Sequence, residues 1–162
     1  MTNLNLSDLS DMDKVRKTLR NPLGEVYFTG HPDANNGLLY ARCVGVELTS
    51  DELIAAGTLT LELLRQYQLQ CLLFDLSCYL GGWEGAYEWQ KQVWIPSIQE
   101  LGLKRNAIVM SSNFFGQLSA EHSLTMEGMH TEQLKSRLFI NRKEALEWLN
   151  GCCRICKKVV GF

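Results

Sequence analysis

Five polar residues that could bind a ligand, or react with one, follow two short apolar runs of the sequence, CLLF and AIVM. They are Asp75, Ser77, Ser111, Ser112 and Asn113. Short continuous apolar runs are typical of buried parallel strands, and ligands of open α/β sheets gather at the carboxyl ends of such strands. The sequence therefore predicts that these side chains line one small polar mouth. The alternative is that Asp75 and Asn113 cap the helices that follow and the serines shape turns.

Ser77 is the residue of this group that could act as a nucleophile. It would need a base such as His122, because a neutral serine hydroxyl is a weak nucleophile. No G-x-S-x-G turn surrounds Ser77, although such a turn is typical of one large class of serine hydrolases. The glycines at positions 81, 82 and 85 are not followed by the Lys-Ser/Thr pair of a phosphate-binding loop. We therefore assign no catalytic residue and no cofactor, and a weak serine hydrolase is kept as the second alternative.

Three of the four tryptophans lie between positions 83 and 94. Trp89 falls on the apolar stripe of a predicted helix and is expected in the core. Trp83, beside two glycines, and Trp94, one position beyond that stripe, are expected to be exposed. Because tryptophan is enriched at protein interfaces, these two residues and Glu84 are candidates for binding a partner or ligand. The alternative is ordinary packing between helix and loop.

Length and charge exclude several classes of function. The chain has 162 residues and a formal net charge of −2, which suits one domain and provides no attraction to nucleic acid. No apolar run reaches the length of a membrane span, and the polar N-terminus lacks the basic and apolar segments of a secretory signal. We expect a cytoplasmic protein with no nucleic-acid partner and no stable membrane insertion.

Six cysteines are expected to be free thiols in such a protein. The segment CCRIC, residues 152–156, contains one C-x-x-C pair. Because a zinc site needs a second pair of ligands, no metal is predicted.

The order of apolar segments predicts a β-hairpin followed by strictly alternating helices and strands. Asn36-Gly37 marks the hairpin turn, and Thr49 with Glu52 forms a capping box at the start of the first long helix. Such alternation implies parallel strands joined by crossover helices. The predicted fold class is α/β, with a mixed sheet that has a parallel core covered by helices. The predicted strands are 25–29, 38–44, 71–74, 107–110 and 138–140, and the helices begin after Thr49, near Gly85, near Phe114 and after Asn141.

The same pattern divides the chain into a polar lead-in, 1–22, a domain, 23–151, and a C-terminal tail, 152–162. A short helix over Ser10–Leu19 is one interpretation of the lead-in.

Three segments carry a resemblance to a known family. They are LLFDLS (Leu72–Ser77), WQKQVWIPSIQELGLKRNAIVM (Trp89–Met110) and LFINRKEALEWL (Leu138–Leu149). They resemble the STAS-like fold of the sporulation anti-sigma-factor antagonist, and a group of small bacterial stand-alone proteins described as STAS or CRAL-TRIO (lipid-transfer) domain-like. The likeness covers roughly residues 25–150, and its motifs are mostly structural, so they bear on fold more than on function.

The resemblance implies a binding or regulatory module rather than an enzyme. Anti-sigma-factor antagonists carry a phosphorylated serine in an Asp-Ser-Ser-Gly turn, whereas the turn here is GGWEGA and has no hydroxyl group. We therefore expect non-catalytic binding of a protein partner, or of a second copy of the chain, without a phosphoacceptor serine. The expected binding surface is the loop 75–86 and the start of the second helix. The first alternative is a carrier of a small apolar or lipid-like ligand, which the lipid-transfer likeness and the methionines Met126 and Met129 favour.

Overall fold

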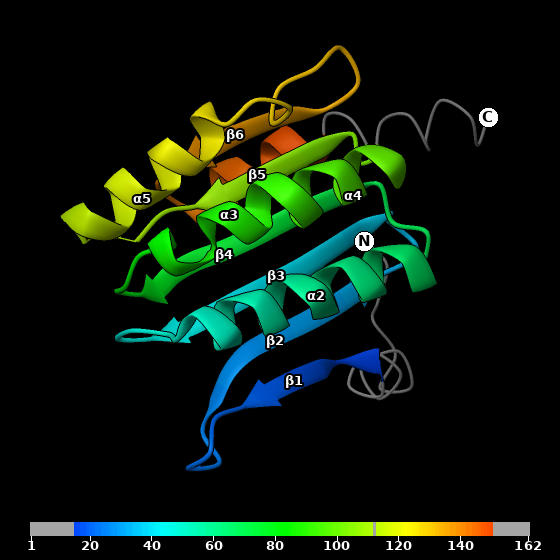
Figure 1. Ribbon diagram of the computed structural model, residues 1–162. Helices are drawn as coiled ribbons and strands as arrows, with labels where there is room; N and C mark the ends of the chain where they lie inside the picture. The colour runs from blue at the N-terminus through cyan, green and yellow to red at the C-terminus, as the bar shows by residue number, and fades with distance from the viewer. Residues whose placement is uncertain (1–14, 112, 151–162) are drawn as a thin grey trace.

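One six-stranded sheet runs through the molecule, and its strands follow each other in space as they do in the sequence. The structure, a computed structural model, describes residues 15–111 and 113–150. The first two strand pairs are antiparallel and the last three are parallel, which confirms the predicted mixed α/β fold (Figure 1). The strands are β1 (Lys17–Arg20), β2 (Val26–Asp33), β3 (Leu38–Gly45), β4 (Cys71–Tyr79), β5 (Arg105–Val109) and β6 (Lys135–Phe139).

The predicted hairpin is formed by β2 and β3, and its turn is held by Asp33. The Oδ1 atom of Asp33 accepts a hydrogen bond from the backbone N–H of Asn36 over 3.3 Å, and its Oδ2 atom accepts one from Asn36 Nδ2 over 2.7 Å. Gly37 ends the turn with a φ of 66°, in the left-handed region that glycine enters without a steric penalty. The turn residues therefore perform the role that their types predict.

Strand β1 was missed by the sequence analysis. It pairs with β2 from Lys17 opposite Gly30 to Arg20 opposite Val26, so the sheet begins inside the range assigned to the lead-in. Residues 17–20 form a strand where the end of a short helix was expected, and residues 1–14 lie outside the described part of the chain.

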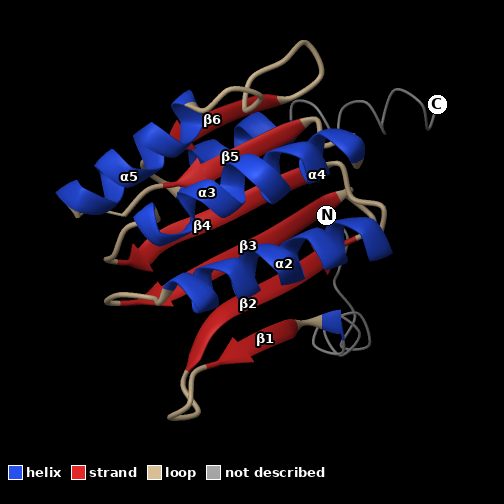
Figure 2. Cartoon of the chain, in the orientation of Figure 1, coloured by secondary structure: helices blue, strands red, loops and turns tan. Residues whose placement is uncertain are grey.

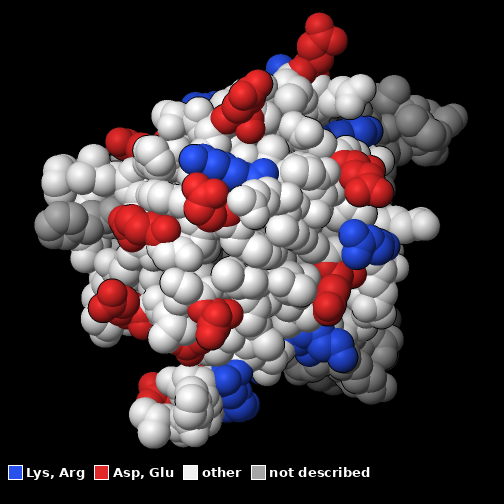
Figure 3. All heavy atoms as spheres, viewed as in Figure 1, with Lys and Arg blue, Asp and Glu red and all other residues white. Residues whose placement is uncertain are grey.

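The crossover helices all lie on one face of the sheet, which we call the helical face (Figures 1 and 2). Because each parallel strand is added beside the previous one, right-handed connections must all fall on the same side. Acidic and basic side chains are interspersed over this face (Figure 3). The helical elements are α2 (Ser50–Gln66), the four short pieces η1 (Glu84–Ala86), α3 (Tyr87–Trp89), η2 (Gln90–Trp94) and α4 (Ile95–Glu100), and α5 (Phe114–Thr125).

The predicted capping box is present at the start of α2. The backbone N–H of Glu52 donates to Thr49 Oγ1 and the backbone N–H of Thr49 donates to Glu52 Oε1, both over 3.1 Å. The box satisfies two N–H groups that have no partner within the helix. It also fixes the residue at which α2 begins after β3.

The second crossover contains a π-helical turn, η2, which changes which side chains face the sheet. Pro96 follows it at the start of α4 and cannot donate a backbone hydrogen bond, so the regular α pattern is interrupted there. The wider turn brings Trp94 inward, to 8% exposure, and leaves Val93 40% exposed. The prediction that Trp94 is exposed is therefore wrong, because it assumed an uninterrupted period of 3.6 residues.

The opposite face of the sheet is covered over β4, β5 and β6 by a final helix, residues 142–150. Asn141 caps this helix, as predicted, by accepting the backbone N–H of Glu144 on Oδ1 over 2.9 Å. A second apolar cluster lies between the final helix and the sheet and includes Leu73, Val109, Phe139, Ala145 and Leu149. No helix in the described part of the chain is long and apolar enough to cross a membrane.

Candidate functional site

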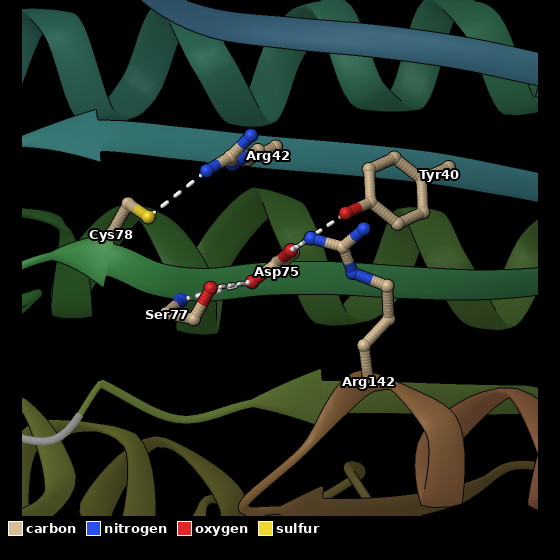
Figure 4. A network of polar contacts seen from close by, with 6 residues as sticks. All are labelled: Tyr40, Arg42, Asp75, Ser77, Cys78 and Arg142. Carbon is tan, nitrogen blue, oxygen red and sulfur yellow. Dashed lines mark hydrogen bonds and ion pairs between the residues drawn. The ribbon is translucent and has the colours of Figure 1, made fainter.

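Strand β4 supplies side chains to two different environments. Successive residues of a strand point to opposite faces of the sheet. Leu72, Phe74 and Leu76 therefore belong to the core beneath the crossover helices. Asp75 lies on the opposite face of the sheet. Figure 4 looks onto this face, so the crossover helices are seen behind the strands. The two environments are an apolar cavity and a polar network.

The polar network is centred on Asp75, which is fully buried. Tyr40 donates its hydroxyl to Asp75 Oδ2 over 2.6 Å. Ser77 donates both its hydroxyl, over 2.6 Å, and its backbone N–H, over 2.9 Å, to Asp75 Oδ1. Arg142, at the start of the final helix, approaches Asp75 Oδ2 with Nη2 at 3.3 Å (Figure 4). Both carboxylate oxygens are thus satisfied, which removes most of the cost of burying this charge.

The network lowers the pKa of Asp75. Burial by itself raises this pKa, but the hydrogen bonds from Ser77 and Tyr40 and the charge of Arg142 together outweigh burial. A carboxylate whose pKa is lowered is a poor general base, and the hydroxyl of Ser77 is bonded directly to it. His122 lies on α5, on the helical face, where it stacks on Tyr87 at a ring distance of 4.8 Å. The structure therefore does not bring Ser77 and His122 together.

Arg42 makes a separate contact on the opposite face. Its Nη2 atom donates to Cys78 Sγ over 2.9 Å, and this bond raises the pKa of Arg42, so the guanidinium stays charged. The Nε atom of Arg42 is buried without a hydrogen-bond partner. Half-exposed Arg42 and exposed Cys78 thus border the Asp75 network.

The cysteines differ in state. Cys43 and Cys78 are free, and burial raises the pKa of the Cys43 thiol. Cys71 is disulfide-bonded, so the prediction of free thiols is wrong for this residue. Cys152, Cys153 and Cys156 lie outside the described residues. Within the described residues no group of three or more His, Cys, Asp or Glu side chains is arranged to hold a metal ion.

The polar residues after β5 perform local roles. Ser111 Oγ accepts the backbone N–H of Asn113 over 3.0 Å, and the carbonyl of Asn113 accepts the N–H of Gln117 over 3.0 Å, as at the start of a helix. Ser112 lies outside the described residues. Ser111 and the backbone of Asn113 therefore shape the entry to α5, whereas Asp75 bonds to Tyr40 and Ser77.

A cavity of about 70 Å³ lies on the helical face, between the sheet and the crossover helices. Its lining is predominantly apolar and includes three of the four tryptophans. Trp83, predicted to be an exposed binding residue, is partly buried at this wall and packs edge-on against Phe74 at a ring distance of 5.5 Å. The lining residues are Leu53, Gly57, Phe74, Leu76, Trp83, Ala86, Trp89, Gln90, Trp94, Asn106, Ile108, Ala120, Ser123 and Met129.

Small residues on the helices make room for the aromatic walls. A Cβ atom at Gly57 would lie 2.5 Å from Cη2 of Trp89, closer than packed carbon atoms approach. The missing side chain of Gly57 lets α2 lie against the Trp89 indole of the next crossover. Ala86 and Ala120 line the cavity from η1 and α5, so short side chains leave the space open.

Three polar side chains line the cavity. Two of them are hydrogen bonded to each other, and the third has an oxygen atom without a partner. Gln90 and Ser123 bond to each other, with Gln90 Nε2 donating to Ser123 Oγ over 2.6 Å and Ser123 Oγ lying 2.9 Å from Gln90 Oε1. Asn106, on β5, is 2% exposed and its Oδ1 atom has no hydrogen-bond partner. The cavity therefore contains one polar group that the described residues leave unsatisfied.

Sequence reasoning did not find this site. Asn106 stands in the run LKRNAIVM and Gln90 between two tryptophans. A polar residue inside an apolar run was the available signal, since buried polar groups normally have partners. Glu84, another predicted binding residue, is exposed at the start of η1 and does not line the cavity.

Comparison with known proteins gives no relative. No protein-family model, no curated protein and no solved structure matches the chain. The function must therefore be argued from the geometry.

Proposed function

We propose that this protein is a non-catalytic binding module that holds a small, uncharged, mostly apolar ligand between its sheet and its crossover helices. The observation that carries the proposal is the cavity on the helical face. Clefts lined by apolar and aromatic side chains with a few polar groups are the usual form of small-molecule sites. No Lys, Arg, His, Asp or Glu lines this cavity, so a charged ligand would enter without a counter-ion.

The volume of the cavity limits the size of the ligand. An engineered apolar cavity of roughly 150 Å³ accepts benzene, and this cavity is about half as large. It suits one part of a short aliphatic molecule such as butan-1-ol, whose other part leaves the cavity past the partly exposed Trp83 and Trp89. The lipid-transfer likeness agrees with an apolar ligand, and the STAS-like resemblance stays a prediction.

The proposal excludes a catalytic role for Ser77. Its hydroxyl is bonded to a carboxylate that the hydrogen bonds of Ser77 and Tyr40 and the charge of Arg142 keep ionised. A nucleophile needs a base that takes its proton, and Asp75 is a poor one. The Asp75 network supports the fold instead, because it ties β3, β4 and the final helix together.

The test is a titration of the ¹⁵N-labelled protein with butan-1-ol and 1-fluorobutane, followed through the tryptophan indole N–H signals. Trp83, Trp89 and Trp94 line the cavity, whereas Trp148 packs on the opposite face and serves as an internal control. We expect the first three signals to move and the Trp148 signal to stay. Equal movement of all four, or none, would contradict the proposal.

A pair of variants on α5 sharpens the test. Ala120→Leu fills the cavity from a buried position and should abolish the shifts. Leu118→Ala alters an exposed side chain of the same helix that does not line the cavity, and should leave binding unchanged. Undiminished binding to the Ala120→Leu protein would place the ligand elsewhere.

A second candidate function is association with another protein at the carboxyl edge of the sheet, where the sequence predicted an interface. Large apolar side chains are exposed there at Val46, Leu80, Phe114 and Leu118, beside the exposed acidic residues Glu47 and Glu84. Sedimentation velocity of the wild type and of a Val46→Ser, Leu80→Ser double variant tests self-association. Concentration-dependent dimers that the variant lacks would support this function, and monomers at every concentration would rule out a second copy as the partner.

A further inference from the structure

The amide oxygen of Asn106 lies in the wall of an apolar cavity without a hydrogen-bond partner. Asn106 is 2% exposed, and its Oδ1 atom is buried and unpaired. Buried side-chain amides are normally satisfied by protein or water, so an unpaired amide oxygen in the wall of a cavity marks a place where a hydrogen-bond donor fits.

The neighbouring groups cannot supply the missing partner. In the sheet, Asn106 stands between Leu72 of β4 and Ser136 of β6. Leu72 is apolar, and the hydroxyl of Ser136 donates to the carbonyl of Met129 over 2.7 Å. Across the cavity, Gln90 and Ser123 are paired with each other. The partner of Asn106 Oδ1 is therefore a donor inside the cavity, either a water molecule or the hydroxyl of a ligand that displaces it.

We infer that the ligand of this cavity is a neutral molecule with a short apolar body and a hydroxyl group that hydrogen bonds to the Asn106 amide. This inference rests on the proposed function and specifies its ligand. A half-turn about χ2 exchanges the amide oxygen and nitrogen, and a hydroxyl, which both donates and accepts, pairs with the amide in either orientation. The apolar body lies against the other walls, among them Phe74, Trp94 and Ile108.

Other polar groups fit this environment less well. A carboxylate cannot donate a hydrogen bond, and no cation lines the cavity to offset its charge. An ammonium group would lack a carboxylate partner for the same reason. Carboxylate and ammonium ions are therefore disfavoured in this cavity, and a neutral hydroxyl group fits it better.

The experiment compares butan-1-ol with 1-fluorobutane, in which fluorine replaces the hydroxyl at nearly the same size, and with butyrate. Affinities are measured by the shifts of the indole N–H signals of Trp89 and Trp94, and the side-chain amide signals of Asn106 are followed in the same spectra. We expect butan-1-ol to bind about fivefold to tenfold more tightly than 1-fluorobutane, the worth of one hydrogen bond. Its binding should move the Asn106 amide signals, and butyrate should not bind.

Asn106→Leu removes the amide at similar volume, and in this variant the alcohol and the fluoride should bind equally. Asn106→Ala provides the same comparison if the leucine variant does not fold. Leu118→Ala, at an exposed position that does not line the cavity, is the control and should keep the preference for the alcohol. Equal binding of both probes to the wild type, or a preference that survives Asn106→Leu, would overturn the inference and leave the proposed function intact. Failure of both probes to bind the wild type would overturn the proposed function itself.

Discussion

Asp75 and Asn106 are both buried polar side chains on adjacent strands, and they differ in what surrounds them. Asp75 receives hydrogen bonds from Tyr40 and Ser77 and the charge of Arg142, whereas the Oδ1 atom of Asn106 has no partner and the residue borders a cavity. A buried polar group whose partners come from the chain contributes to the fold. One that lacks them weakens the fold, and for Asn106 the proposed ligand would supply the missing partner.

The largest loss of stability is expected from replacing Asp75, the centre of the hydrogen-bonded network. Asp75→Ala leaves Tyr40 and Ser77 without their acceptor and Arg142 without its counter-ion. The free energy of unfolding should fall by about 2–3 kcal/mol, because Tyr40 and Ser77 lose their acceptor, whereas half-exposed Arg142 is solvated by water. Urea unfolding at neutral pH measures this change, and a loss below about 1 kcal/mol would show that the network is not structural.

A smaller loss is expected at the wall of the cavity. Gly57→Ala places a Cβ atom 2.5 Å from Trp89, and overpacking of this kind costs about 1–3 kcal/mol. The better helix propensity of alanine offsets about 1 kcal/mol of this cost, so a net loss of stability is expected. The displaced indole of Trp89 should also alter the near-ultraviolet circular dichroism spectrum. Thr58→Ala, at the next and exposed position of α2, is the control and should leave the spectrum unchanged. A Gly57→Ala protein with wild-type stability and spectrum would mean that Trp89 moves away freely.

The charge of Asp75 also predicts a pH dependence. Because the folded-state pKa lies below the ordinary value of 3.8, the stabilisation is complete above that value and is lost as the pH falls through the folded pKa. Asp75→Asn keeps the shape but not the charge, and should cost about 1–2 kcal/mol at neutral pH. The difference in unfolding free energy between wild type and variant should shrink only below about pH 4. A difference that is independent of pH down to pH 2 would show that the ionised form is not stabilised.

The smallest change in stability is expected for Asn106, whose buried Oδ1 atom has no hydrogen-bond partner. Asn106→Leu removes a buried amide whose oxygen is unpaired and adds apolar volume, so stability should stay within about 1 kcal/mol of the wild type or rise. The same chemical unfolding measurement checks this prediction. A loss comparable to that of Asp75→Ala would show that Asn106 has structural partners in solution and would remove the contrast between the two faces.

Local signals in the sequence were sufficient for most of the fold. The capping box of Thr49 and Glu52, the Asn36-Gly37 turn and the Asn141 cap are each formed by residues a few positions apart. The turn geometry and the first helical hydrogen bonds depend on these neighbours alone. Such features can therefore be predicted without knowledge of the tertiary structure.

The site depends on distant contacts, and it could not be predicted in the same way. The π-helical turn at Gln90–Trp94 shifts the helix face by one residue and carries Trp94 from its expected exposed position into the cavity wall. Gly57 and Trp89, on different crossovers, pack closely together in the wall of this cavity. Asp75 and Ser77 were recognised as polar residues of a strand, but whether they bind a ligand or each other is decided by Tyr40 and Arg142, which are remote in the sequence.

The most direct test of a ligand site on the helical face is a crystal structure of the protein soaked in butan-1-ol, with a second crystal pressurised with xenon. We predict electron density for both in the cavity beside Trp94, with the alcohol oxygen within hydrogen-bond distance of the Asn106 amide. An empty cavity in both crystals, or occupancy only at the exposed apolar edge near Leu80, would contradict the account.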